Sequence, residues 1–124
     1  MLKAAARLTL ALFVLGMASA AFAQKTTVLR VVVVKTDNVA AYLQQVEKGK
    51  EIIKKIGGQA DIRVWQARFA GPEAGSIAVG IEYPSMAAFA ADMAKIGSSS
   101  EYQAWLKGLD KVRTIVSDSL YGEL

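Results

Sequence analysis

The sequence predicts an α+β domain whose elements follow the order β-α-β-β-α-β. A valine-rich segment has the β-branched composition of a buried strand. Two segments carry apolar residues at helical spacing, and two more strand patterns flank a short connection rich in Gly and Pro. In chain order the expected elements are a strand at 28–35, a helix at 39–56, strands at 60–69 and 76–83, helical segments at 86–96 and 101–109, and a strand at 112–121.

The N-terminus reads as a secretory signal peptide covering residues 1–23. Lys3 and Arg7 supply a short positive region, an uncharged apolar run follows from Leu8 to Met17, and Ala21-Phe22-Ala23 fits the small-residue cleavage pattern. A transmembrane anchor is the alternative, but the apolar run is shorter than the ~20 residues that a spanning helix needs. We therefore expect export to the periplasm or the medium, no stable membrane anchor after cleavage, and a single domain over residues 24–124.

Composition excludes several kinds of chemistry. The sequence has no Cys and no His, which removes disulfides, thiolate nucleophiles and the side chain that most often serves as a general base or binds zinc and haem. We expect no metal site and no cofactor. The formal net charge is +4, but two of the basic residues lie in the expected leader. A charge this small does not favour nucleic acid as a partner.

The first strand and helix have clear boundaries. Val28–Lys35 is almost continuously apolar, which is typical of a strand covered on both faces, and Arg30 interrupts the face it shares with Val28. Thr36-Asp37-Asn38 offers helix caps, and Gly57-Gly58 ends the helix. The expected buried stripe of this helix consists of Val39, Leu43, Val46, Ile53 and Ile56.

The second half of the chain also has recognisable helix and strand boundaries. Tyr83-Pro84-Ser85 ends the strand at 76–83, and Ser85 is a suitable N-cap for a helix that buries Phe89, Met93 and Ile96. We expect Gly97 to end that helix and Ser98 to pair with Glu101 in a capping box for the next helical segment, which buries Trp105. Strict alternation in the last strand places Asp118 on the side opposite Arg113 and Ile115.

The element order is that of a ferredoxin-like fold, a four-stranded antiparallel sheet with its helices on one face. The first strand carries valines on both sides, so the face without helices also needs a cover. A second copy that packs sheet against sheet in a two-fold homodimer would provide it.

The segments I-x-V-x-I-E-Y-P-S-M-A-A-F at 77–89 and E-Y-x-x-W-L at 101–106 resemble the dimeric α+β barrel superfamily over nearly the whole mature chain. Within it, the chain is most similar to NIPSNAP-like and uncharacterised exported members. The resemblance implies a fold more than an activity, because the superfamily includes cofactor-free monooxygenases, haem-degrading enzymes and proteins without known activity. Haem-handling members usually provide a histidine ligand, which this chain lacks.

Candidate ligand-binding residues are polar or aromatic side chains on strands with apolar neighbours: Arg30, Trp65, Arg68, Glu82 and Asp118. An arginine–carboxylate cluster can hold a small anionic or carbonyl ligand, with Trp65 or Tyr83 as a wall. Alternatively, the same residues form structural ion pairs or line a dimer interface, because a buried charge needs a partner in either case.

Three functions follow from these residues. The first is an exported homodimer that binds a small organic ligand or has a structural role. The second is a cofactor-independent monooxygenase or isomerase acting on an activated organic substrate, with arginine polarising it. The third is a module that binds a partner through the lysine-rich helix at 39–56, although charged residues in such a pattern usually mark a solvated face.

Overall fold

The computed structural model describes residues 26–69 and 71–124, so the predicted signal peptide at 1–23 lies outside the described residues. The elements are β1 (Val28–Lys35), α2 (Val39–Lys55), β2 (Asp61–Gln66), a short 3-10 helix η1 (Gly71–Glu73), β3 (Ile77–Tyr83), α3 (Met86–Ser98), α4 (Ser100–Leu109) and β4 (Thr114–Gly122). No helix within these two ranges has the length and apolar character needed to cross a bilayer.

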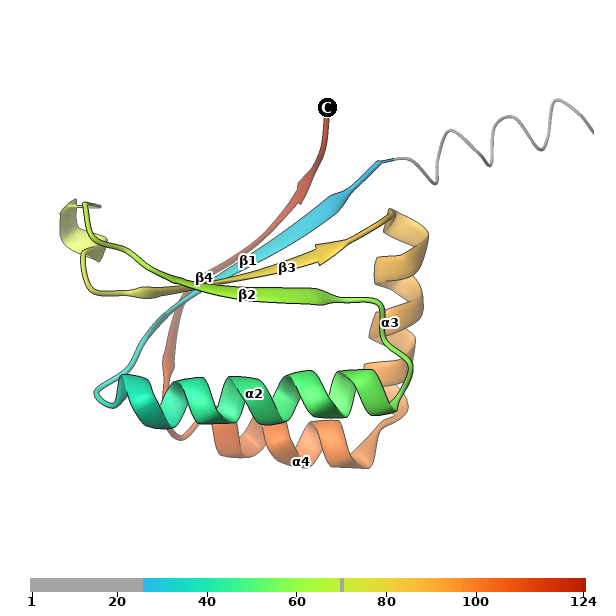
Figure 1. Ribbon diagram of the computed structural model, residues 1–124, viewed down its shortest axis with the longest axis horizontal. Helices are drawn as coiled ribbons and strands as arrows, with labels where there is room; N and C mark the ends of the chain where they lie inside the picture. Colours follow the sequence, from blue (N-terminus) through green and yellow to red (C-terminus); the bar gives the residue numbers. More distant parts are fainter. Residues whose placement is uncertain (1–25, 70) are drawn as a thin grey trace, which may run out of the picture.

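The four strands form one antiparallel sheet in the order β2-β3-β1-β4. Figure 1 shows α2 and α4 beneath one face of this sheet, with α3 at one end. The predicted fold class is therefore confirmed: the chain has the α+β, ferredoxin-like architecture. Below, the inner face of the sheet is the one that faces the helices, and the outer face is the opposite one.

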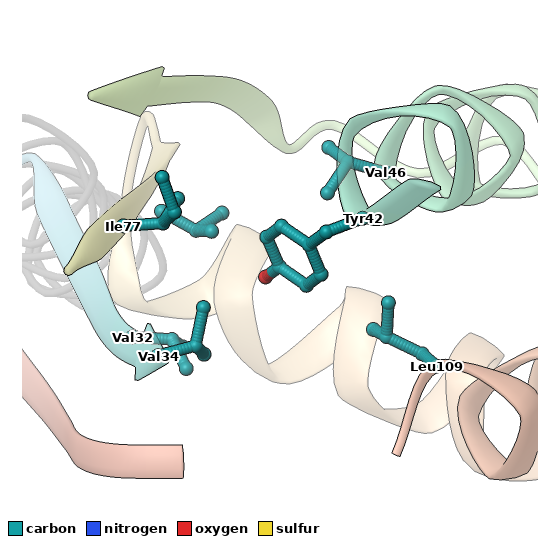
Figure 2. Packing of buried hydrophobic residues seen from close by; sticks show 7 residues of the cluster. Val32, Val34, Tyr42, Val46, Ile77 and Leu109 are labelled. Carbon is teal, nitrogen blue, oxygen red and sulfur yellow. The ribbon is translucent and has the colours of Figure 1, made fainter. Parts of the chain in front are cut away.

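The core lies between the inner face and the helices. The Tyr42 ring from α2 sits between the valines of β1 and Leu109 of α4 (Figure 2). Val34 and Tyr42 are almost completely buried. A second cluster at the α3 end joins Val28 and Tyr83, and Tyr83 meets the edge of the Phe89 ring.

Most predicted caps are confirmed. Asn38 accepts a hydrogen bond from the Ala41 amide and Ser85 accepts one from the Ala88 amide. Gly57 ends α2 with a positive φ of 77°. The predicted Ser98–Glu101 box is wrong, because α3 continues through Ser98, whose hydroxyl instead donates to carbonyls in its own last turn. Ser99 is the N-cap of α4.

The predicted stripe of α2 is partly wrong. Val46 and Ile53 are buried, but Val39 and Leu43 are exposed. The buried side consists of Tyr42, Val46, Gly49, Ile52 and Ile53. The helix is turned so that the large Tyr42 ring, which fills the space against β1 and α4, takes the core position, and this rotates the first-turn aliphatic residues outward.

The outer face carries the other set of β1 side chains, Leu29, Val31 and Val33, which are half-buried. Small residues lie beside them on β3, where Ala78 pairs with Val33 and Gly80 with Val31. Trp65 of β2 lies over Gly80, so closely that a Cβ built on Gly80 would be 2.6 Å from the Trp65 ring carbon Cζ3. The centre of this face is therefore apolar and has low relief, with Trp65 at one side.

Candidate ligand-binding cavity

A cavity of about 170 Å³ lies between the inner face of the sheet and the three helices. Its walls are mainly apolar, with Val32, Val79 and Ile81 on the sheet side and Met93 and Trp105 on the helix side. A cavity of about 150 Å³ is large enough to hold benzene. The space therefore suits a ligand of about one substituted ring.

Gly49 and Trp105 shape the helix side of this cavity. A Cβ on Gly49 would overlap the six-membered part of the Trp105 indole, so α2 and α4 approach closely only because Gly49 has no side chain. The Trp105 Nε1 donates a hydrogen bond of 2.8 Å to the Gln45 carbonyl. Trp105 thus turns its apolar surface to the cavity while its one donor is satisfied elsewhere.

An ion pair between β1 and β4 lines the cavity. Arg30 Nε donates to Asp118 Oδ1 at 2.9 Å and Nη2 donates to Oδ2 at 2.6 Å, which is a two-pronged pairing. The hydrogen bonds to Asp118 raise the pKa of Arg30, and those from Arg30 lower the pKa of Asp118. About a third of each side chain is exposed.

A second guanidinium, that of Arg113, reaches the cavity from the segment before β4. Its Nε and Nη2 both donate to the same oxygen of Asp110, at 3.3 and 3.1 Å. The Arg113 side chain is only 10% exposed. Arg113 was not among the predicted site residues.

Three tyrosines also line the cavity. Burial, together with the nearby Asp92 carboxylate, raises the pKa of Tyr83 to about 12. Burial likewise raises the pKa of Tyr42 and Tyr102, while the Arg113 guanidinium opposes both shifts. All three phenols are therefore protonated at neutral pH, so they can donate a hydrogen bond but cannot serve as bases.

The predicted site residues divide between three places. Arg30 and Asp118 meet and line the cavity. Glu82 and Trp65 lie on the outer face, because Glu82 pairs with Leu29 and Trp65 with Ala78 in the sheet register. Arg68 is exposed in the connection after β2. Trp65, Arg68 and Glu82 therefore do not join Arg30 and Asp118 in the lining of the cavity.

Asp92 of α3 is a buried polar residue that the sequence analysis missed, and its side chain is 1% exposed. Its Oδ2 accepts hydrogen bonds from the amides of Gln59 (2.8 Å) and Ala60 (3.1 Å), in the turn between α2 and β2. The only sequence signal was a carboxylate beside Met93 on the apolar stripe of a helix. Asp92 does not line the cavity, and its contacts are those of a residue that fixes the turn.

The lysine-rich helix is not a uniform positive surface. Lys50 pairs with Glu47 on the same helix, and Lys55 pairs with Glu101 of α4. Within residues 26–69 and 71–124, no three acidic side chains gather in a way that could hold a metal ion.

Comparisons with known proteins identify proteins of the same fold. No family model matches the sequence, and no curated protein matches it. Among solved structures, SnoaB from Streptomyces nogalater, a cofactor-independent oxygenase, is 11% identical with a TM-score of 0.60, over 79% of this chain and 93% of SnoaB. A NIPSNAP domain protein from Burkholderia xenovorans is 15% identical with a TM-score of 0.60, over 80% of this chain and 92% of its own.

A third structure, an antibiotic biosynthesis monooxygenase-like protein from Bordetella bronchiseptica, is 9% identical with a TM-score of 0.53, over 79% of this chain and 95% of its own. Identities this low show the fold alone. The chain has the fold of the dimeric α+β barrel superfamily, which its NIPSNAP-like members share. The resemblance inferred from the sequence is therefore confirmed at the level of fold.

Proposed function

We propose that this protein binds a small, largely apolar organic molecule in the cavity between the sheet and the helices. The observation that carries the proposal is the cavity itself, which combines apolar walls with a few convergent polar groups from Arg30, Arg113 and the tyrosines. That combination is typical of small-molecule sites. A purely structural role would need no such space, because protein interiors are otherwise close-packed.

The test is a calorimetric and thermal-shift screen of single-ring compounds against residues 24–124. Ile81→Phe places a ring in the cavity and should abolish binding. Val116→Phe is the matched control, since Val116 is exposed on β4 and does not line the cavity. If no compound binds the wild-type chain, or if Ile81→Phe binds as well as wild type, the proposal is wrong.

We further propose that the protein is a homodimer assembled through the outer face. Leu29, Val31 and Val33 lie half-exposed at the centre of the sheet between small residues, a surface that a second sheet can cover closely. Sedimentation at micromolar concentration should give a dimer, and Val31→Glu should give a monomer. Val39→Glu adds the same charge to an exposed position on α2 and should leave the dimer intact. A monomeric wild-type protein would contradict the proposal.

Export remains a proposal that rests on the sequence of residues 1–23. Cell fractionation and N-terminal sequencing should find a chain that begins at Gln24 outside the cytoplasm. A chain that keeps its first residues in the cytoplasmic fraction would contradict it.

A cofactor-independent oxygenase is the second candidate function. The likeness to SnoaB favours it, together with a cavity in which Arg30 and Arg113 can stabilise negative charge on a bound substrate. In such a reaction an electron-rich substrate itself reduces dioxygen, and the protein supplies orientation and charge. Oxygen uptake with a panel of dihydroxyarenes should exceed the rate without protein, and Arg30→Ala should lower it. Uptake equal to the background, or unchanged in Arg30→Ala, would contradict this candidate.

A further inference from the structure

The two arginines of the cavity differ in how well their charge is matched. Arg30 meets both oxygens of Asp118, at 2.9 and 2.6 Å. Arg113 meets a single oxygen of Asp110, at 3.1 and 3.3 Å, although its side chain is far more buried. A guanidinium has five N–H donors, and its best partner is an anion that offers two oxygens. Arg113 therefore pairs less completely with its carboxylate than Arg30 does, and the Tyr42 hydroxyl is its other close polar neighbour.

The unused donors of Arg113 are not sealed inside the protein. Within the described parts of the chain, the fully enclosed side-chain atoms without a hydrogen-bond partner are Ser76 Oγ and Asp92 Oδ1, and no Arg113 nitrogen belongs to this set. Its Nη1 takes no part in the contact with Asp110. Arg113 lines the cavity, so its guanidinium has donors that Asp110 does not use.

The charges on the cavity wall do not cancel. Arg30, Arg113 and Asp118 are the charged residues that line it, while Asp110, the partner of Arg113, is mostly exposed and lies outside the lining. The lining therefore carries two guanidiniums and one carboxylate, and the carboxylate that pairs with Arg113 contacts it from outside the lining. An anion bound in the cavity would meet two guanidinium groups there, and guanidinium–carboxylate hydrogen bonds are among the strong ones.

We propose that the ligand of the cavity is a small planar monoanion, an apolar ring that carries a carboxylate, and that Arg113 is the residue that selects it. This inference rests on the proposed ligand-binding function and adds the charge class of the ligand. The ring fills the apolar part of the cavity between the sheet and Trp105. The two oxygens of the ligand carboxylate accept hydrogen bonds from the Arg113 guanidinium. Asp110 offers that guanidinium a single oxygen.

The test compares two probes of equal shape and different charge, 4-methylbenzoate and 4-methylbenzamide, by calorimetry on residues 24–124 at neutral pH. The benzoate should bind about 10- to 100-fold more tightly, the factor that a charge-assisted hydrogen bond contributes. Arg113→Met should remove this preference, so that the two probes bind with similar affinity. Lys111→Met removes the same charge from an exposed residue two positions away, outside the cavity lining, and should keep the preference.

The possible results separate the two proposals. If neither probe binds, the proposed ligand-binding function fails. If the benzamide binds as tightly as the benzoate, the cavity binds ligands but the inference about charge is overturned. If Arg113→Met keeps the preference, Arg113 is not the selecting residue. Should Arg113→Met fail to fold, Arg113→Lys keeps the charge without the two-pronged geometry, and an undiminished preference in that variant also overturns the role of Arg113.

Discussion

Asp92 should be among the most important polar residues for stability, although it lies outside the cavity. Its Oδ2 accepts two backbone amides, those of Gln59 and Ala60, and so ties α3 to the turn between α2 and β2. Each hydrogen bond to a charged group contributes about 1.5–3 kcal/mol. The cost of burying the carboxylate, whose Oδ1 has no partner among the described residues, offsets part of this sum. We expect Asp92→Ala to lower the free energy of unfolding by about 2–4 kcal/mol.

Asp92→Asn separates the acceptor from the charge. An asparagine carbonyl can accept both amides, so we expect a loss of about 1 kcal/mol or less. The assay is urea denaturation of residues 24–124 followed by circular dichroism, with all variants at one protein concentration because a dimer would make stability concentration-dependent. Asp61→Ala is the control: Asp61 is exposed and pairs with Arg63 on its own strand, so the loss of free energy of unfolding should stay within about 0.5 kcal/mol.

Two results would refute this reasoning. A loss below about 1 kcal/mol in Asp92→Ala would mean that the two amides find other acceptors when the carboxylate is removed. Equal losses in Asp92→Ala and Asp92→Asn would mean that the charge of Asp92, not its position as an acceptor, stabilises the turn.

Three further predictions follow from contacts at the cavity and on the outer face of the sheet. Gly49→Ala should destabilise the protein by about 1–3 kcal/mol in urea denaturation, because the new Cβ overlaps Trp105, whereas helix propensity alone predicts a gain of about 1 kcal/mol. Gly108→Ala on α4, where a Cβ meets nothing within 4 Å, should show that gain, and equal signs for the two variants would contradict the contact. The pKa of Asp118 is lowered in the folded state from its ordinary value of 3.8, so the ion pair contributes its full stability above about pH 4 and loses it as the pH falls through the folded pKa. Wild type and Asp118→Asn should differ in free energy of unfolding by at most about 1 kcal/mol, because the pair is partly exposed. This difference should shrink as the pH is lowered. A difference that stays constant down to pH 2 would contradict the contribution of the ion pair. Gly80→Ala should push the Trp65 ring off β3, shift the tryptophan emission and weaken the proposed dimer, while Gly122→Ala, with open space around its Cβ, should do neither.

Local patterns were enough to predict the fold. The valine-rich β1, the caps Asn38 and Ser85, and the glycine that ends α2 are signals carried by neighbouring residues, and each is found where it was expected. The rotation of α2 was not predictable in the same way. Periodicity treats Val39 and Leu43 as equal to Tyr42, but only the packing against β1 and α4 shows that the tyrosine ring fills the core.

The composition of the cavity wall depends on a β-bulge, which the alternation of side chains along a strand cannot predict. The register between β1 and β4 shifts after Val33: Val33 pairs with Ser117, but Val34 pairs with Ile115. This bulge reverses the alternation at Val116, so Ile115 and Asp118 both line the cavity, although strict alternation separates them. Strict alternation also places Arg113, two residues before Ile115, on the side away from Asp118, so the sequence pattern does not mark it as a site residue.

The protonation states of the cavity connect the two candidate functions. The tyrosines that line it stay protonated at neutral pH, the low pKa of Asp118 makes it a weak base, and the sequence has no histidine. A substrate that must lose a proton before it reacts would therefore have to be acidic enough to ionise on its own, with Arg30 and Arg113 stabilising the anion. The ligand inferred above and an oxygenase substrate thus share one property, a negative charge on the bound molecule. A preference for the neutral probe would therefore count against the oxygenase candidate as well as against the inferred charge of the ligand.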